Sequence, residues 1–369
     1  MKKFVKLISL VAAVATMSAM FAGCSFGGGK KVEVGIVLPT KDEPRWTQDE
    51  TRFRDELKKT NNSVEILFSQ ASSAKEKENV EALIAKGIKV LIICPQDGAA
   101  AGAAVEAAKK ANVKVISYDR LITKTDAVDY YVTFDSVTVG KEQGKYLVDN
   151  AAKKPGTPLY LYAGASSDNN AFLFFQGAWS VLQPKIADGT FVIANSSEAI
   201  ALKDKAELTR EEQAKIIGQV TTNWDMGEAK NKAQAHLTSA AANMKGDVAI
   251  LAPNDGTSRS IADTFKADTA ITSYVISGQD AEKASVQYII DGKQSMTVFK
   301  DVRTLVKDSI AMAVSILKDE TPETTGTYNN EKIDVKAKQS AVMVVDQKNV
   351  KSALVDSGYY KESDFTNLK

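Results

Sequence analysis

The sequence predicts an α/β fold in which two doubly wound, Rossmann-like parallel-sheet lobes lie in one chain. From residue 32 onward, short apolar runs alternate with amphipathic segments of helix length. This pattern is typical of parallel strands that helices cover on both faces. The alternation forms two series, and 369 residues suffice for two domains of ordinary size. The hydrophobic share of 44% and the charged share of 25% are those of a globular protein.

The first series contains five predicted strands with helices between them. Apolar residues recur at helical spacing in SSAKEKENVEALIAKG (72–87) and GAAAGAAVEAAKKAN (98–112). The predicted strands are VEVGIVL (32–38), VEILF (64–68), KVLIICP (89–95), VKVISYD (113–119) and YYVTF (130–134).

The second series repeats this alternation. Its predicted strands are PLYLYAG (158–164), TFVIAN (190–195), DVAILAPN (247–254), SYVISGQD (273–280), SMTVFK (295–300) and AVMVVD (341–346). Helices are predicted over 170–185, 227–244, 258–267, 302–319 and 349–358. Residues 197–225 lack a clean strand–helix rhythm and are interpreted as an insertion near the domain face, and the polar stretch 320–331 as a connection.

The two series set the expected domain boundaries. We expect an N-terminal lobe from residues 32–137 with 283–320, and a C-terminal lobe from residues 138–282 with 321–369.

The N-terminus carries an export signal. A basic start, MKKFVK, precedes the apolar run LISLVAAVATMSAM and the small-residue site FAGC, which ends at Cys24. The cysteine at this junction resembles the lipobox of bacterial lipoproteins. That resemblance implies a signal peptide over 1–23, lipidation of Cys24, and a tether over 24–31 that anchors the exported chain to the membrane. The alternative is a soluble secreted protein with a cysteine near its cleavage site.

Several function classes are excluded by composition and motifs. The net charge of +1 offers no electrostatic footprint for nucleic acid. The sequence has no GxGxxG or P-loop pattern, no GxSxG, no HExxH and no clustered Cys and His. The sole histidine, His236, lies in a predicted helix away from any strand end. We therefore expect neither an enzyme, a metal site nor a cofactor.

Polar side chains follow most of the predicted strands. Ligands of doubly wound sheets bind beyond the carboxyl ends of the strands, so we expect these side chains to converge. Carboxylates, amides, Arg and Lys suit a ligand rich in hydroxyl groups, and indoles offer flat apolar faces to a sugar ring. The candidates are Lys41, Arg45, Trp46, Asp119, Arg120, Asn169, Asn170, Asn254, Asp255, Asp280 and Lys300, with Trp224 from the irregular segment. Helix caps, core packing and salt bridges between the lobes remain alternatives for individual members.

Collinear motifs then resemble a known family. PTKDEPRW, ISYDRLI, YVTFD, SSDNNAFLFFQGAWSVLQP, APNDGT, ISGQDAE, TVFKDVRTL and SGYYKESDF resemble the periplasmic sugar-binding proteins, in their xylose-binding and multiple-sugar-binding branch. The resemblance implies the periplasmic binding protein type I fold, with two lobes joined by a three-strand hinge. It also implies that the lobes close on one monosaccharide and present it to the permease of an ABC importer.

The resemblance assigns a role to each candidate. It implies that Trp46 and Trp224 sandwich an aldopyranose such as xylose, glucose or galactose. The first-lobe contacts would be Lys41, Arg45, Asp119 and Arg120, and the remaining contacts Asn169, Asn170, Asn254, Asp255, Asp280 and Lys300. Among these, Arg120, Asp255 and Asp280 are expected to matter most, and Gln279 is expected at a hinge. For Asn254, the alternative that its side chain faces away from the sugar stays open.

Three alternatives to an importer receptor stay open. The protein could be a sensor that reports sugar to a membrane kinase or chemoreceptor, a receptor for a furanose or signalling sugar, or a sugar-responsive repressor. The export signal and the lack of a helix-turn-helix ahead of residue 32 disfavour the repressor. We expect a monomer that touches the membrane only through its lipid anchor.

Overall fold

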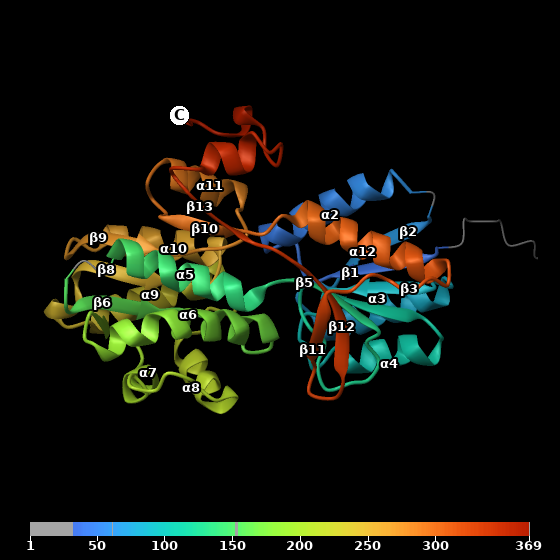
Figure 1. Ribbon diagram of the computed structural model, residues 1–369, viewed down its shortest axis with the longest axis horizontal. Coiled ribbons are helices and arrows are strands. Elements are labelled where there is room, and N and C mark those ends of the chain that lie inside the picture. Colours follow the sequence, from blue (N-terminus) through green and yellow to red (C-terminus); the bar gives the residue numbers. More distant parts are fainter. Residues whose placement is uncertain (1–31, 61, 152–153, 369) are drawn as a thin grey trace, which may run out of the picture.

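The computed structural model describes residues 32–368 except 61, 152 and 153, and they form two α/β lobes side by side (Figure 1). The expected signal peptide, Cys24 and the tether lie outside the described residues. The predicted class, α/β with parallel sheets, is confirmed.

The first lobe is built on a sheet with strand order β11-β12-β5-β4-β3-β1-β2. All neighbours are parallel except β11, which runs antiparallel to β12. Because the register is parallel, the strands that end at Leu38, Ile93 and Tyr118 finish at one edge. The strands are β1 (Val34–Leu38), β2 (Val64–Phe68), β3 (Val90–Ile93), β4 (Lys114–Tyr118), β5 (Tyr130–Phe134), β11 (Gly326–Asn329) and β12 (Asp334–Ser340).

Helices cover both faces of this sheet. On one face, Leu83 of α3 and Val105 of α4 belong to one buried cluster, and on the other, Phe53 of α2 and Leu305 of α12 belong to a second. Burying each such side chain contributes about 1.5–3 kcal/mol. The helices are α2 (Pro44–Leu57), α3 (Ser73–Ala85), α4 (Gly102–Lys110) and α12 (Val302–Leu317).

The second lobe is built on the parallel sheet β7-β6-β8-β9. A bridge between Gln279 and Val298 continues it to β10, which pairs with β13 in antiparallel fashion. The strands are β6 (Thr157–Leu161), β7 (Phe191–Ile193), β8 (Gly246–Leu251), β9 (Ile271–Ile276), β10 (Met296–Phe299) and β13 (Met343–Asp346).

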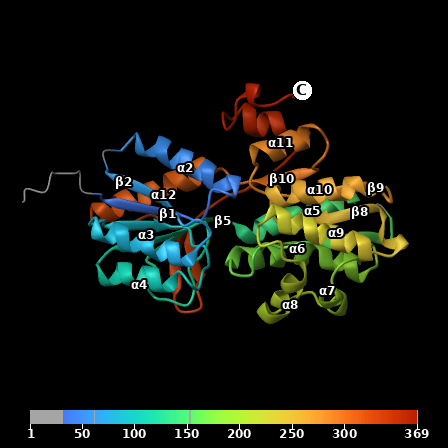
Figure 2. The same cartoon turned by 180° about the vertical axis from the view of Figure 1, so that it is seen from behind.

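Helices α9 and α10 cover one face of the second sheet (Figure 2). Helices α6 and α8 pack on the other face, where Trp179 and Ile216 share a buried cluster. The helices are α5 (Ser136–Ala151), α6 (Asn169–Ala187), α7 (Ser197–Ala201), α8 (Arg210–Val220), α9 (Met226–Ser239), α10 (Asp255–Ala267) and α11 (Lys283–Ile290), with short turns at Ala242–Met244, Lys351–Val355 and Glu362–Asp364.

Helices α5 and α6 touch backbone to backbone through glycines. A β-carbon on Gly140 would lie 1.9 Å from the carbonyl oxygen of Phe174, and one on Gly177 would lie 2.0 Å from that of Val137. Glycine at both positions therefore lets α6, whose first turn reaches the interlobe region, pack directly on α5.

Two of the expected domain boundaries need correction. Residues 283–299, expected in the first lobe, pack with the second, because β10 pairs with β13 and α11 packs beside it. Residues 326–340, expected in the second lobe, belong to the first, because β12 pairs with β5. In the described part of the chain, three segments therefore connect the lobes: residue 135, residues 300–301 and residues 341–342.

Strand β12 and helix α8 are among the elements that had no counterpart in the sequence-based expectation. In the first half of strand β12, Val335 and Ala337 are buried, and polar residues alternate with them. The strand therefore lacks the continuous apolar run of the predicted strands. Segment 197–225 is not an excursion from the fold, because α8 buries Ile216, Ile217 and Val220 in the second-lobe core.

Candidate functional site

A polar cavity lies between the lobes, beyond the carboxyl ends of both sheets. Its lining residues are Glu43, Arg45, Trp46, Asp119, Arg120, Asp168, Asn170, Phe174, Trp224, Asn254, Gln279, Asp280 and Lys300.

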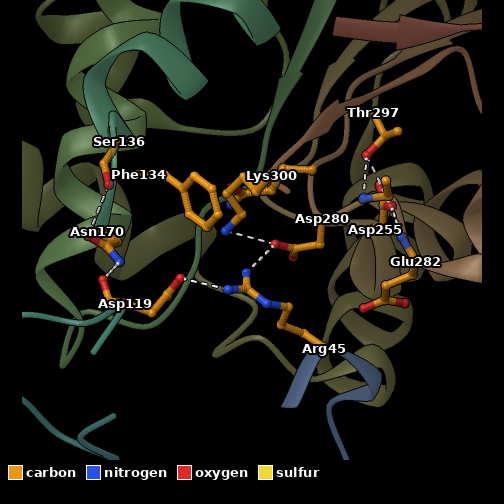
Figure 3. A network of polar contacts seen from close by, with 12 residues as sticks. Arg45, Asp119, Phe134, Ser136, Asn170, Asp255, Asp280, Glu282, Thr297 and Lys300 are labelled. Carbon is orange, nitrogen blue, oxygen red and sulfur yellow. Dashed lines mark hydrogen bonds and ion pairs between the residues drawn. The ribbon is translucent and has the colours of Figure 1, made fainter. Parts of the chain in front are cut away.

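Arg45 connects three carboxylates at the centre of this cavity. Pro44 begins α2 just past β1, which places Arg45 in the first helical turn at the sheet edge. Its Nε lies 2.8 Å from Oδ1 of Asp49, and its Nη2 lies 2.9 Å from Oδ2 of Asp119. Its Nη1 lies 3.0 Å from Oδ1 of Asp280, which comes from the other lobe (Figure 3). The guanidinium fork thus joins the two lobes.

Asp280 is shared between two cations. Its Oδ1 also lies 2.7 Å from Nζ of Lys300, at the end of β10. Burial acts to raise the pKa of Asp119, but the charges of Arg45 and Lys300 outweigh it and hold that pKa below its usual value. The centre of the cavity therefore holds carboxylates and cations in alternation.

Arg120 forms a second ion-pair group against a tryptophan. Its Nε lies 3.1 Å from Oδ2 of Asp168, its Nη2 lies 3.2 Å from Oε2 of Glu43, and its guanidinium carbon lies 4.9 Å from the ring centroid of Trp46. Asp168 also caps α6. Burial raises the pKa of Asp168 to about 6, although Arg120 opposes the shift.

Each lobe contributes one indole to the cavity. Trp46, 2% exposed, stands in the first turn of α2, and Trp224, 8% exposed, precedes α9. Trp224 has φ +63°, a rare conformation for a bulky residue. Both indole N–H groups are buried without a hydrogen-bond partner among the described residues. Such conformations and orphan donors concentrate at functional sites.

Two asparagines of the second lobe lie in the wall. Asn170 Nδ2 donates to the carbonyl oxygen of Asp119 across the lobes at 2.8 Å, and its Oδ1 accepts from Ser136 Oγ at 3.1 Å. Asn254, a predicted contact for which facing away was the alternative, contributes to the wall while its Oδ1 accepts from Thr257 Oγ1 at 2.6 Å.

Asp255, expected among the main ligand contacts, does not line the cavity. It is fully buried and accepts hydrogen bonds from Gln294 Nε2 at 2.8 Å, Thr297 Oγ1 at 3.1 Å and the Glu282 backbone at 2.9 Å. Burial raises its pKa well above the usual value. Because Asp255 begins α10 one residue after the cap, its side chain points into the lobe and ties two loops together (Figure 3).

Lys41 and Asn169 also lie outside the lining. The Lys41 side chain is 60% exposed and pairs with Glu50 at 3.1 Å. Asn169 Oδ1 accepts from Arg210 Nη1 at 3.0 Å. Asn169 stands between two lining residues, Asp168 and Asn170, whereas Lys41 stands two residues before the lining residue Glu43.

Sequence reasoning left four lining residues out of the candidate set. Asp168 and Gln279 follow strands, but that signal does not distinguish a cavity residue from a helix cap or a hinge residue, which was the expectation for Gln279. Glu43 lies in the motif PTKDEPRW. Phe174 lies one helical turn after Asn170 on α6, so helical spacing could have found it.

His236 lies away from the cavity, on α9, where its Nδ1 is 3.0 Å from Asn195 Nδ2 and 3.2 Å from the Tyr162 hydroxyl. Among residues 32–368, less the three gaps, no group of three His, Cys, Asp or Glu side chains is arranged to hold a metal ion. No helix in the described part of the chain has the length and apolar character to cross a bilayer.

The fold and the cavity define a class of protein. Two parallel-sheet lobes, with charged groups and one indole from each lobe around an interlobe cavity, form a receptor that encloses a small polar solute. The periplasmic binding protein domain model matches residues 34–321, and the chain belongs to this family. Its members are solute-binding receptors and not enzymes, as the sequence predicted.

Individual relatives support the same assignment. The chain is 34% identical over 364 residues to the multiple sugar-binding periplasmic receptor ChvE of Rhizobium radiobacter, covering 96% of this chain and 98% of that one. It is 30% identical to the D-xylose-binding periplasmic protein of Escherichia coli, covering 91% and 93%. A carbohydrate transporter solute-binding protein of Chloroflexus aurantiacus, solved in complex with D-glucose, is 71% identical, with a TM-score of 0.90 over 92% of this chain and 100% of that one. The predicted resemblance to sugar-binding receptors is confirmed.

Proposed function

We propose that this protein is an exported receptor that encloses one aldopyranose, with D-glucose the first candidate, and delivers it to an ABC importer. The carrying observation is that Trp46 and Trp224, from different lobes, line one cavity. Closure of such lobes on a ligand is a hinge motion known for periplasmic binding proteins. The 71% identical relative in complex with D-glucose supports glucose over the other aldopyranoses.

The chemistry of the cavity supports a hydroxyl-rich, uncharged ligand. Asp119 and Asp280 supply acceptors, and Arg45, Arg120 and Lys300 supply donors. A hydrogen bond to a charged group contributes about 1.5–3 kcal/mol, and micromolar affinity requires about 8 kcal/mol. A few such bonds, with the burial of the sugar ring between the indoles, therefore suffice even after the ordering costs of binding.

We also propose that the receptor is a monomer, anchored through a lipid on Cys24. The basic start, apolar run and FAGC site support export and anchoring. The import role follows from the class of the relatives, which includes a carbohydrate transporter solute-binding protein.

Calorimetric titration of the chain with D-glucose, D-xylose, D-galactose, L-arabinose and D-ribose tests the proposal. We expect micromolar or tighter binding of at least one aldopyranose. Trp224→Ala should weaken this binding at least tenfold, because the sugar ring loses the apolar face of the indole. Absence of binding to every sugar, or unchanged affinity in the variant, would contradict the proposal.

A further inference from the structure

The C-terminal motif SGYYKESDF, which the cavity does not use, reaches from the second lobe to the first. Tyr359 packs in the second lobe, with its ring centroid 4.7 Å from that of Phe299. The backbone oxygen of Tyr359 nevertheless accepts from Nη2 of Arg52 in α2 at 2.9 Å, and the Arg52 guanidinium lies 5.0 Å from the Tyr359 ring centroid. The segment is thus bound to one lobe and contacts the other.

Tyr360 joins α2 to the loop that follows β9. Its hydroxyl accepts a hydrogen bond from Nε2 of Gln48 and donates one, of 2.8 Å, to the carbonyl oxygen of Ala281. Oε1 of Gln48 accepts from the Tyr359 hydroxyl at 3.4 Å. We call the Gln48–Tyr360–Ala281 connection the outer tie. It consists of uncharged groups, and none of these residues lines the cavity.

The outer tie runs parallel to a connection inside the cavity. This inner tie is the ion pair between Arg45 and Asp280. Arg45 stands three residues before Gln48 on α2, and Asp280 directly precedes Ala281. The same helix and the same loop are therefore joined twice, once through groups that line the cavity and once through groups that do not.

The loop needs external support because its backbone is strained. Asp280 has φ +100° and Ala281 has φ +49°, both in a region that residues other than glycine rarely adopt. The Ala281 N–H donates to Thr297 Oγ1 at 3.1 Å, and its carbonyl oxygen accepts from Tyr360. Such conformations persist only where the surroundings hold them. Tyr360 therefore helps to fix the direction of the Asp280 carboxylate.

We propose that Tyr360 is a positioning residue for sugar binding. Through the outer tie it holds α2 and the 280–281 loop in the closed arrangement, so that Arg45 and Asp280 face the sugar together. The outer tie holds the lobes closed without contacting the ligand. Its loss therefore acts mainly on the rate at which the sugar dissociates from the closed complex. The inference rests on the proposed function for its ligand, but the geometry of the tie does not.

Stopped-flow measurement of D-glucose dissociation from the full chain tests the proposal. Tyr360→Phe removes one hydroxyl, and we expect dissociation about three- to tenfold faster, the effect of losing a hydrogen bond or two of ordinary strength. Tyr160→Phe is the matched control, because the Tyr160 hydroxyl donates to the Met244 carbonyl at 2.8 Å within one lobe. Tyr160→Phe should leave the dissociation rate unchanged, while it lowers thermal stability about as much as Tyr360→Phe does. Equal dissociation rates in Tyr360→Phe and wild type would overturn the proposal.

A double variant separates the tie from general destabilisation. Gln48→Leu should accelerate dissociation as Tyr360→Phe does, and the two together should add little, because both break one connection. Fully additive effects on the dissociation rate would overturn the proposal that Gln48 and Tyr360 act through one connection. If the wild type bound no sugar, the proposed function would fail. X-ray scattering of the sugar-free proteins would then test the outer tie independently of sugar binding. A larger radius of gyration in Tyr360→Phe would support it, and an unchanged radius would overturn it.

Discussion

The indole of Trp224 lies against Gly164 so closely that a β-carbon on Gly164 would come within 2.0 Å of Cζ2 of the ring. Gly164 ends the segment after β6, and the isolated bridge from Ala163 to Thr221 holds the two segments together there. The position of the second-lobe indole is therefore set by the absence of a side chain beneath it.

Gly164→Ala should displace this indole from the cavity wall. We expect D-glucose affinity to fall at least tenfold in calorimetry, with the fold retained by circular dichroism. Gly256→Ala is the control, because its β-carbon would meet Met226 Cγ at 3.4 Å, Met226 Sδ at 3.7 Å and Glu282 Oε1 at 3.8 Å, which are ordinary contacts. Comparable affinity in the two variants would contradict this placement of Trp224.

Asp280 and Asp255 should respond differently to replacement by asparagine. Asp280→Asn removes the charge that Arg45 and Lys300 share, and sugar affinity should fall at least tenfold. Asp255→Asn should change affinity less than threefold, because burial raises the pKa of Asp255 and favours a neutral carboxyl that Asn resembles. Calorimetry on both variants checks the order, and a larger loss in Asp255→Asn would refute it.

Stability should depend on pH through Asp168. Its pKa is raised from 3.8 to about 6 by burial, so between these values the folded state binds the proton more tightly than the unfolded state. The free energy of unfolding therefore falls as pH rises from about 4 to about 6, by about 1.4 kcal/mol per unit at most for one group.

The Asp168→Asn variant should lose this part of the pH dependence. Chemical denaturation of both proteins at several pH values measures it. The stability of wild type relative to the variant should decline across the window and level off above it. Parallel curves would mean that Asp168 does not titrate as described.

The glycines between α5 and α6 should be sensitive to a single methyl group. Gly177→Ala places a β-carbon 2.0 Å from the Val137 carbonyl oxygen. We expect the free energy of unfolding to fall by roughly 1–3 kcal/mol or more through overpacking. Gly218→Ala, inside α8 with nothing within 4 Å, should be neutral or stabilise by about 0.5–1 kcal/mol. Thermal or urea denaturation distinguishes the two, and equal effects would be inconsistent with the close contact.

Membrane association should depend on Cys24. Cys24→Ser removes the thiol that lipidation requires, and we expect the exported chain to move from the membrane to the soluble fraction after expression in a bacterial host. Retention of the variant in the membrane fraction would contradict the proposed anchor.

Much of the fold follows from local pattern. Buried runs such as those before Leu38 and Ile93 are continuous and apolar, so their strands and the common edge where they end were predictable. The strand-end rule then placed Arg45, Asp119 and Asp280 around one site without knowledge of the packing.

The sequence by itself determined the two α/β lobes, the location of the site and the chemical character of its lining, because each depends on residue type and order along the chain. Only the tertiary structure decided that Asp255 turns inward and that Tyr360 reaches α2. It also decided that residues 283–299 belong to the second lobe and residues 326–340 to the first, each opposite to the expectation. The physical reason is that side-chain direction at a helix start and the partner of a polar strand depend on contacts between segments far apart in sequence, which no local pattern encodes.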